Sequence, residues 1–452
     1  MTRPISFPVK ICSFLWAAAV LSGSGPPALA QGSAARNPIS FSHYMLSNGL
    51  QVILAEDYTL PVVSVVVTYR VGSADDPPGR AGLAYLLEDL MFLGSANVSQ
   101  MQHIGFINRV GGQLSAMAKE DRTLFYQTVP SNHLALVLWL ESDRMRSLQP
   151  TEAKVESSKS SLIEEIRQRL YQDPYAGASQ AFDRLLYPDY AFGHPVFGQE
   201  NDLRIISPDE AQSFYSTYYV PNNAIVCVCG NINKLKAREL VSRYFESIPR
   251  GKEPPSPPPE AQKYVKAART EAFQDPRIQV PGFWLAFRVP TLAPEDVYGL
   301  TILDYILFRG RNSRLFKRLW QRERLVLSMT GGLERRNGLL AYRLFATTTN
   351  TLLIDRSLRA IFAELQSIKS SFIGAEELAK AKNIFTMDYY NRQGTTLDKA
   401  IVLSEAFLTL KKFEDLPLEL DKYLQVTPQL LVGLANRYFT QANAIIATIN
   451  AR

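Results

Sequence analysis

The two halves of this chain carry the same local pattern at the same spacing, and this repeat constrains the fold more than any other feature. In the first half, a Ser-Pro pair ending at Pro208 opens a helical pattern that leads into a strand pattern at Ala224. In the second half, a Thr-Pro pair ending at Pro428 does the same ahead of Ala444. The proline precedes the alanine by 16 residues in both halves. Serine and threonine are preferred helix N-caps, and proline is favoured at the first helical position. The repeat predicts two homologous α/β domains.

A proline-rich stretch at residues 249–259 separates the two halves. Five of its last six residues are proline, a composition that favours an extended and semi-rigid spacer. We therefore predict an N-terminal domain over residues 37–248, a linker over 249–261 and a C-terminal domain over 262–452. Each half has the size of one ordinary domain.

Apolar periodicity predicts the elements of the first half. β-branched runs predict strands over residues 50–54, 62–71, 123–129 and 224–230, and helical periodicity predicts helices over residues 82–92, 133–145 and 152–170. Strands and helices are interspersed with hairpin-like neighbours, which favours an antiparallel or mixed sheet with helices on one face, an α+β class. Cys227 and Cys229 lie two residues apart on one predicted strand, so they face the same side, where we expect two buried thiols.

The first 30 residues have the composition of an export signal. Arg3 and Lys10 precede a short apolar run, and Ala28 and Ala30 frame an A-x-A cleavage site. We expect the mature chain to begin at Gln31 and to be exported, to the periplasm if the source is Gram-negative. We expect no membrane span in the mature chain, because the apolar run is too short to cross a bilayer and no later run is long enough.

The charge of the chain gives no support for a nucleic-acid partner. The net charge is +6, and removal of the predicted signal takes away two cations and no acidic residue. The remaining excess is small and forms no basic stripe.

One predicted helix keeps the spacing of a zinc-protease motif without its histidines. Leucines recur at positions 83, 86, 87 and 90 and predict a buried stripe, while Tyr85, Glu88 and Asp89 fall together on the other face. In an inverted zincin the corresponding helix reads H-x-x-E-H, with two histidine ligands and a glutamate as general base. Tyr85 and Asp89 stand where the histidines would be, and only Glu88 remains.

Landmarks over nearly the whole mature chain resemble the pitrilysin/insulinase family of zinc metallopeptidases, which includes the mitochondrial processing peptidase subunits. The landmarks are Asn48-Gly49, Val71-Gly72-Ser73, Gly82-Leu83-Ala84, Gly111-Gly112, Glu164-Glu165, Pro221-Asn222-Asn223 and Ser313-Arg314-Leu315. The resemblance implies the metallohydrolase fold of that family: two homologous α/β domains, each a mainly antiparallel sheet with helices packed on one face. It also implies that such a pair of domains builds only half of a closed chamber.

The resemblance also assigns a role to single positions. Glu88 takes the position of the general base, and Glu165 takes that of the third zinc ligand. Ser115 and Ala116 fall on the edge strand that binds substrate. In the second half the family commonly has an arginine and a tyrosine, seven residues apart, that hold the substrate carbonyl.

In this sequence Trp320 and Leu327 occupy that pair of positions. The charge of a transition state would then have no arginine and tyrosine pair to stabilise it.

These replacements count against autonomous catalysis. Catalytic zinc takes three good protein ligands and keeps one open position. Asp89 and Glu165 offer two oxygens, but the Tyr85 phenol, with an ordinary pKa of about 10, is a poor third ligand at neutral pH. Without a metal there is no acidified water for Glu88 to deprotonate. We expect no cofactor in this chain and zinc only in a partner subunit.

Three functions compete. The first is a non-catalytic subunit that pairs with a zinc-bearing homologue to form a peptidase chamber and capture peptide substrates. The second is a stand-alone peptide-binding protein that uses its exposed strand edge without cleavage. The third is an active metalloendopeptidase with unusual ligands. The remaining carboxylates are also compatible with a site for a hard cation or with plain hydrogen-bonded side chains.

Overall fold

The computed structural model describes residues 39–188, 190–255, 268–289, 294–336, 339–370, 373–410 and 412–450. The predicted signal at residues 1–30 and the linker from residue 256 lie outside the described residues, so cleavage at Gln31 and the domain bounds stay predictions. The chain from Ile39 onward forms one compact unit. None of the described helices combines the length and the apolar character that a membrane crossing requires.

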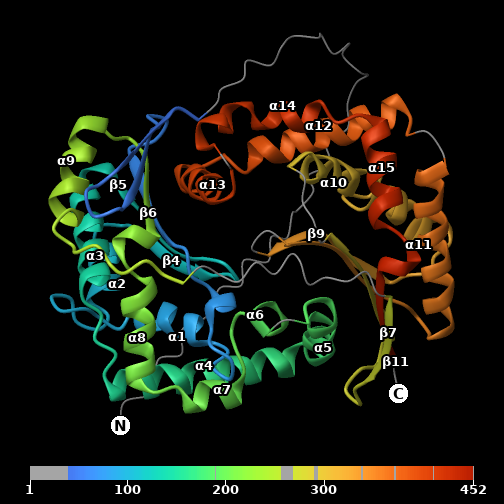
Figure 1. The fold of residues 1–452 in the computed structure, drawn as a ribbon, viewed down its shortest axis with the longest axis horizontal. Coiled ribbons are helices and arrows are strands. Elements are labelled where there is room, and N and C mark those ends of the chain that lie inside the picture. The colour runs from blue at the N-terminus through green and yellow to red at the C-terminus, as the bar shows by residue number, and fades with distance from the viewer. Residues whose placement is uncertain are drawn as a thin grey trace. The chain divides into compact units, whose positions relative to one another are not determined.

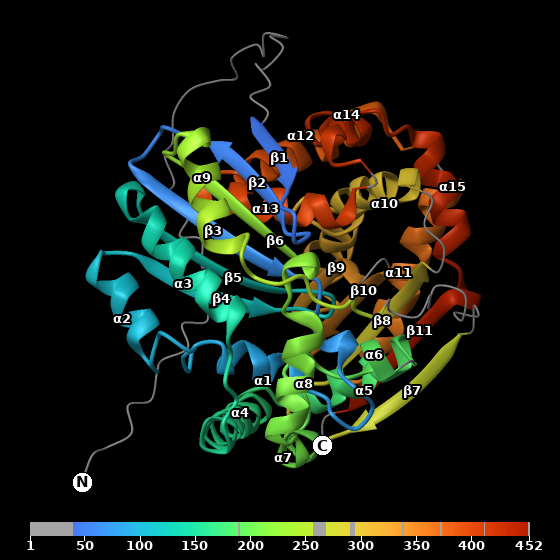
Figure 2. The ribbon, with the colours of Figure 1, turned by 60° about the vertical axis from the view of Figure 1, so that its left-hand side comes forward.

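The first sheet has six strands, in the order β1-β2-β6-β3-β5-β4. Strands β2 and β6 are parallel, and the other neighbours are antiparallel. The strand order can be followed in Figure 2. The strands are β1 (Phe41–Met45), β2 (Gln51–Glu56), β3 (Val62–Tyr69), β4 (Gln113–Ala118), β5 (Thr123–Pro130) and β6 (Ala224–Gly230).

The second sheet repeats the pattern of the first with five strands, in the order β7-β11-β8-β10-β9. Strands β7 and β11 are parallel, as β2 and β6 are, and each of the next three neighbours is antiparallel. The prediction of two homologous, mainly antiparallel domains is therefore confirmed. The strands are β7 (Arg269–Gln274), β8 (Gly282–Val289), β9 (Ser328–Arg336), β10 (Leu339–Thr347) and β11 (Ala444–Asn450).

The repeat extends to single hydrogen bonds. The Ser207 hydroxyl caps α8 (Pro208–Tyr218), and the Thr427 hydroxyl caps α15 (Pro428–Tyr438). After each helix a buried asparagine donates to two carbonyls: Asn223 to those of Arg70 and Tyr218, and Asn443 to those of Arg288 and Tyr438. The same amide therefore fixes the same helix-to-strand turn in both halves.

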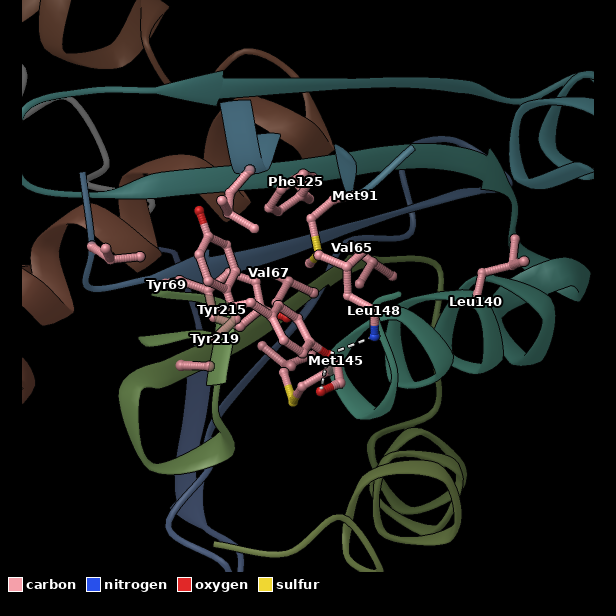
Figure 3. Packing of buried hydrophobic residues seen from close by; sticks show 14 of the residues in the cluster. Val65, Val67, Tyr69, Met91, Phe125, Leu140, Met145, Leu148, Tyr215 and Tyr219 are labelled. Atoms are coloured by element: carbon pink, nitrogen blue, oxygen red, sulfur yellow. Dashed lines mark hydrogen bonds between the residues drawn. The ribbon is translucent and has the colours of Figure 1, made fainter. Parts of the chain in front are cut away.

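Most helices of each half pack on one face of that half's own sheet. In the first half these are α1 (Leu83–Leu90), α3 (Leu134–Arg146), α4 (Glu152–Gln172), α8 and α9 (Lys234–Phe245). Figure 3 shows part of this core, in which Val65, Val67 and Phe125 of the sheet meet Met91, Met145 and Tyr215 of the helical layer. The Tyr215 hydroxyl donates to the carbonyls of Arg144 and Met145 and accepts from the Leu148 amide.

The other face of each sheet is covered by a helix of the opposite half, which the sequence did not reveal. Helix α13 (Thr396–Thr409) packs on β3 and β6, and α5 (Ala176–Leu186) packs on β7, β8 and β11 (Figure 1). Strand β6 is buried at all seven positions because both of its faces are covered. Cys227 and Cys229 are buried free thiols that face α13, as expected for two small core side chains.

The structure describes seven further helices. They are α2 (Gln102–Arg109), α6 (Tyr190–Gly193), α7 (Glu200–Ile205), α10 (Pro294–Leu307), α11 (Leu352–Ser370), α12 (Ala375–Asn391) and α14 (Glu419–Leu424). Short 3₁₀ turns are η1 (Ser73–Asp75), η2 (Ser131–His133), η3 (Pro221–Asn223), η6 (Phe413–Leu418) and η7 (Gln441–Asn443), and η5 (Phe316–Arg322) is a π-helix.

Candidate functional site

Helix α1 is held at its N-terminus by a buried carboxylate. The Asp76 side chain accepts from the amides of Gly82, at 2.7 Å, and Ala84, at 2.8 Å. Gly82 has a φ of 102°, in the left-handed region that favours glycine. The leucine stripe of the helix is buried, so Tyr85, Glu88 and Asp89 lie on its remaining face. Asp76 therefore fixes the start of the helix that carries the candidate site.

Tyr85 and Glu165 are joined directly. The Tyr85 hydroxyl lies 3.1 and 3.3 Å from the two Glu165 carboxylate oxygens and donates to them. Arg169, one turn further along α4, forms an ion pair with Glu165 at 2.6 Å. Burial, with the charge of Glu165 adding to it, raises the pKa of Tyr85 above its ordinary value. The phenol thus keeps its proton, and an arginine already balances the charge of Glu165.

Glu88 and Asp89 are also engaged within the protein. Glu88 Oε2 accepts from the backbone amide of Ala118 at 2.6 Å. Burial raises the pKa of Glu88 to about 7; the Ala118 bond opposes that rise, and the charges of Asp89 and Glu165 add to it. Asp89 accepts from the Ser158 hydroxyl on α4, and burial raises the pKa of Asp89 as well. A carboxyl with a pKa near neutrality is also what general-base chemistry requires.

This set of donors does not fit catalytic zinc. Across the described ranges, no three His, Cys, Asp or Glu side chains are arranged to hold a metal ion. The phenol at position 85 is a donor to Glu165 rather than a ligand, and Arg169 places a positive charge beside the carboxylate that would be the third ligand. Zinc needs three good ligands together, and this arrangement offers at most two.

Strand β4 is an edge of the first sheet, and it lies beside this cluster. Within the part of the chain that the structure describes, no strand pairs with its outer side. In an antiparallel pair, successive residues direct their peptide groups alternately toward the partner strand and away from it. The Lys119 amide donates to the Arg122 carbonyl across the hairpin, so Lys119 faces β5. The peptide groups of Leu114, Ala116 and Ala118 therefore point away from β5. Of the two predicted edge residues, Ala116 thus presents its backbone outward, while Ser115 directs its own toward β5.

Trp320 and Leu327 lie in the second half, at exposed positions. Trp320 is in the π-helix η5 and is 47% exposed, with its ring 5.0 Å from that of Phe316. Leu327 directly precedes β9 and is 51% exposed, and its amide donates to the Thr347 carbonyl. The structure brings Tyr85, Glu88, Asp89 and Glu165 together on α1 and α4, whereas Trp320 contacts Phe316 and Leu327 contacts Thr347.

Sequence reasoning missed three members of the cluster. Arg169 follows Glu165 by four residues on a helix, a spacing that predicts an ion pair, so the signal was available. Ser158 and the Ala118 amide carry no such signal, because they meet Asp89 and Glu88 only through tertiary packing.

The fold and the site together define a class: a duplicated α+β protein with a peptidase-like helix beside an open strand edge. The comparisons with known proteins agree. A family model described as "Insulinase (Peptidase family M16)" matches residues 51–182, and one described as "Peptidase M16 inactive domain" matches residues 206–385. The chain is thus a homologue of the zinc proteases of the insulinase/pitrilysin (M16) family.

Individual relatives span nearly the whole chain. The zinc protease PqqE of Helicobacter pylori is 26% identical over 404 residues, which is 88% of this chain and 91% of PqqE. The crystal structure of a protease from Helicobacter pylori has a TM-score of 0.84 at 24% identity, covering 91% of this chain and all of that one. The periplasmic protease PqqL of Escherichia coli has a TM-score of 0.73 at 18% identity, covering 92% of this chain but 48% of PqqL.

Proposed function

We propose that this chain is a non-catalytic subunit of an exported two-chain peptidase. It supplies half of a chamber and a strand edge for peptide substrates, while a zinc-bearing homologue supplies the chemistry. The observation that carries the proposal is the Tyr85–Glu165–Arg169 group. Tyr85, at the position of the first histidine of the motif, is a hydrogen-bond donor to Glu165 rather than a metal ligand. Arg169 balances the charge of Glu165, which a zinc ion would otherwise do.

Replacements elsewhere in the catalytic apparatus also argue against catalysis by this chain alone. Asp89 is bound to Ser158, and one oxygen of Glu88 is bound to the Ala118 amide. In the second half, Trp320 and Leu327 stand where the family's arginine and tyrosine would hold the substrate carbonyl. Two separate parts of the catalytic apparatus are therefore replaced, and loss of an oxyanion donor alone costs about 10²–10³ in rate.

Peptide capture rests on β4. Its outward groups are those of Leu114, Ala116 and Ala118, and Glu88 takes one of them, the Ala118 amide. The others remain for an extended peptide that adds to the sheet as a further strand, a common recognition mode in which main-chain hydrogen bonds supply affinity. Glu88 thus occupies the last outward amide of β4 and limits where an added strand can pair, rather than acting as a base.

The partner and the location are proposed from the family. This chain corresponds to about half of PqqL, whose title describes a periplasmic protease. We propose that a zinc-bearing homologue on another polypeptide supplies the other half of the chamber, and that the signal-like first 30 residues direct this chain to the same compartment. The relative PqqE is named a zinc protease, which is the kind of homologue expected as the partner.

Reconstitution tests the proposal. The mature chain, a homologue with an intact H-x-x-E-H motif from the same source, and an equimolar mixture of the two are assayed on the same fluorogenic peptides. We expect the two proteins to co-purify and cleavage to require both. Full activity of the homologue alone, with no complex between the chains, would reject the subunit role and favour the stand-alone peptide-binding protein.

One observation favours a second candidate, an active metalloendopeptidase with unusual ligands. The pKa of Glu88 is raised to about 7, where a general base works best. That candidate requires peptidase activity from the mature chain alone, abolished by Glu88→Gln. The subunit proposal requires no activity from the chain alone, with or without this substitution.

A further inference from the structure

The tip of the β4–β5 hairpin is not specified by its own sequence. Glu120 and Asp121 connect Lys119 to Arg122, and neither has a positive φ. The favoured two-residue hairpin turns need positive φ and are rich in glycine and asparagine. The conformation of this tip therefore depends on contacts with the rest of the protein.

Those contacts come largely from the opposite half of the chain. Lys119 Nζ, at 2.8 Å, and Arg122 Nη2, at 2.6 Å, both donate to Oε1 of Glu405 on α13. Glu120 accepts from Arg336 of β9 at 3.2 Å. Three of the four tip residues thus form ion pairs with residues of the second half. The Arg122 side chain is 14% exposed, so its pair with Glu405 is partly shielded from water.

The tip also continues directly into the open edge. The Lys119 and Glu120 carbonyls accept from the amides of Ser73 and Ala74, and the Ala118 amide donates to Glu88. Any movement of Lys119 is therefore transmitted to Ala118 and to the outward peptide groups of β4. Glu405 fixes this segment from the other side, while apolar contacts of Ala400, Leu403 and Ala406 already hold α13 on the sheet.

We infer that Glu405 is a positioning residue for the peptide-binding edge. The second half, through one carboxylate on α13, holds the β4–β5 tip so that the outward groups of Leu114 and Ala116 lie in register for an added strand. This inference rests on the peptide capture proposed above. It gives the second half a direct part in substrate binding.

A charge reversal with rescue tests this role. Glu405→Lys places a third cation against Lys119 and Arg122, and the double variant Glu405→Lys/Lys119→Glu restores an ion pair at the same place. Lys399→Gln is the matched control, since Lys399 lies on the same helix and pairs with Asp57, away from the hairpin. Hydrogen exchange of the Ser115 and Met117 amides, which face β5, is followed without peptide. Binding of a short fluorescein-labelled peptide of alternating valine and threonine is followed by anisotropy.

We expect Glu405→Lys to speed exchange at Ser115 and Met117 by about tenfold and to weaken peptide binding by at least about fivefold. The double variant should recover both values, and Lys399→Gln should change neither, at a comparable melting temperature. Equal effects of Glu405→Lys and Lys399→Gln, or no recovery in the double variant, would overturn the inference. If the exchange results are as expected but the wild-type chain binds no peptide, the positioning of β4 stands and peptide capture fails.

Discussion

The substitution Glu88→Gln tests how the residual site is built. Burial raises the pKa of Glu88 from 4.5 to about 7, so the folded protein holds a proton that the unfolded chain releases between these two values. The free energy of unfolding should therefore fall as the pH rises through this range. A pKa difference of about 2.5 corresponds to about 3 kcal/mol at roughly 1.4 kcal/mol per pKa unit.

Glutamine keeps the acceptor for the Ala118 amide but carries no charge at any pH. We expect Glu88→Gln to be more stable than the wild type by up to about 3 kcal/mol at about pH 8, with the difference vanishing below pH 4.5. Other buried carboxyls, such as Asp75, titrate in both proteins, so the difference between them isolates Glu88.

Urea denaturation at closely spaced pH values measures this difference. Glu239→Gln, at an exposed position of α9, is the matched control and should show no such trend. A Glu88→Gln protein that is less stable than the wild type at about pH 8 would refute the reasoning. It would mean that the ionised carboxylate has a stabilising partner, as a bound metal ion would be.

Three further predictions follow from the same contacts. The double variant Tyr85→His/Asp89→His should bind zinc weakly while Arg169 still pairs with Glu165, and adding Arg169→Gln should raise the zinc affinity. Calorimetric titration measures the zinc affinity of both variants. Equal affinities would show that Arg169 does not compete with zinc for Glu165. Asn443→Ala leaves two buried carbonyls without a donor and should lower the free energy of unfolding by about 1–3 kcal/mol in urea denaturation, with a smaller loss ruling out a structural role for this amide. N-terminal sequencing of the exported protein should begin at Gln31, and an exported chain that still starts at Met1 would contradict the predicted cleavage.

Much of the fold could be predicted because the chain is a duplication. The 16-residue spacing before Ala224 and Ala444 anticipates two domains, and the matching strand orders and the paired roles of Asn223 and Asn443 confirm them. The packing of α13 on the first sheet and of α5 on the second, in each case the sheet of the opposite half, could not be predicted. An apolar stripe on a helix shows that it is buried but not against which sheet, and the only local signal was the uninterrupted apolar run of β6.

The candidate site was predictable only in part, for a similar reason. Positions 85, 88 and 89 share one helix face, so periodicity was enough to group them, and the family resemblance added Glu165. Their actual partners come from α4 and from the backbone of β4, and distant contacts of this kind leave no periodic trace in a sequence. The ion pair that ties Glu405 to the hairpin tip is hidden from the sequence in the same way.

The metal content of the mature wild-type protein tests the central claim most directly. After purification and dialysis against buffer with a trace of zinc, elemental analysis should find far less than one zinc ion per chain, because Tyr85 donates to Glu165 and Arg169 balances its charge. One tightly held zinc ion per chain, lost on Glu165→Ala, would contradict the account and make this chain a metallopeptidase in its own right.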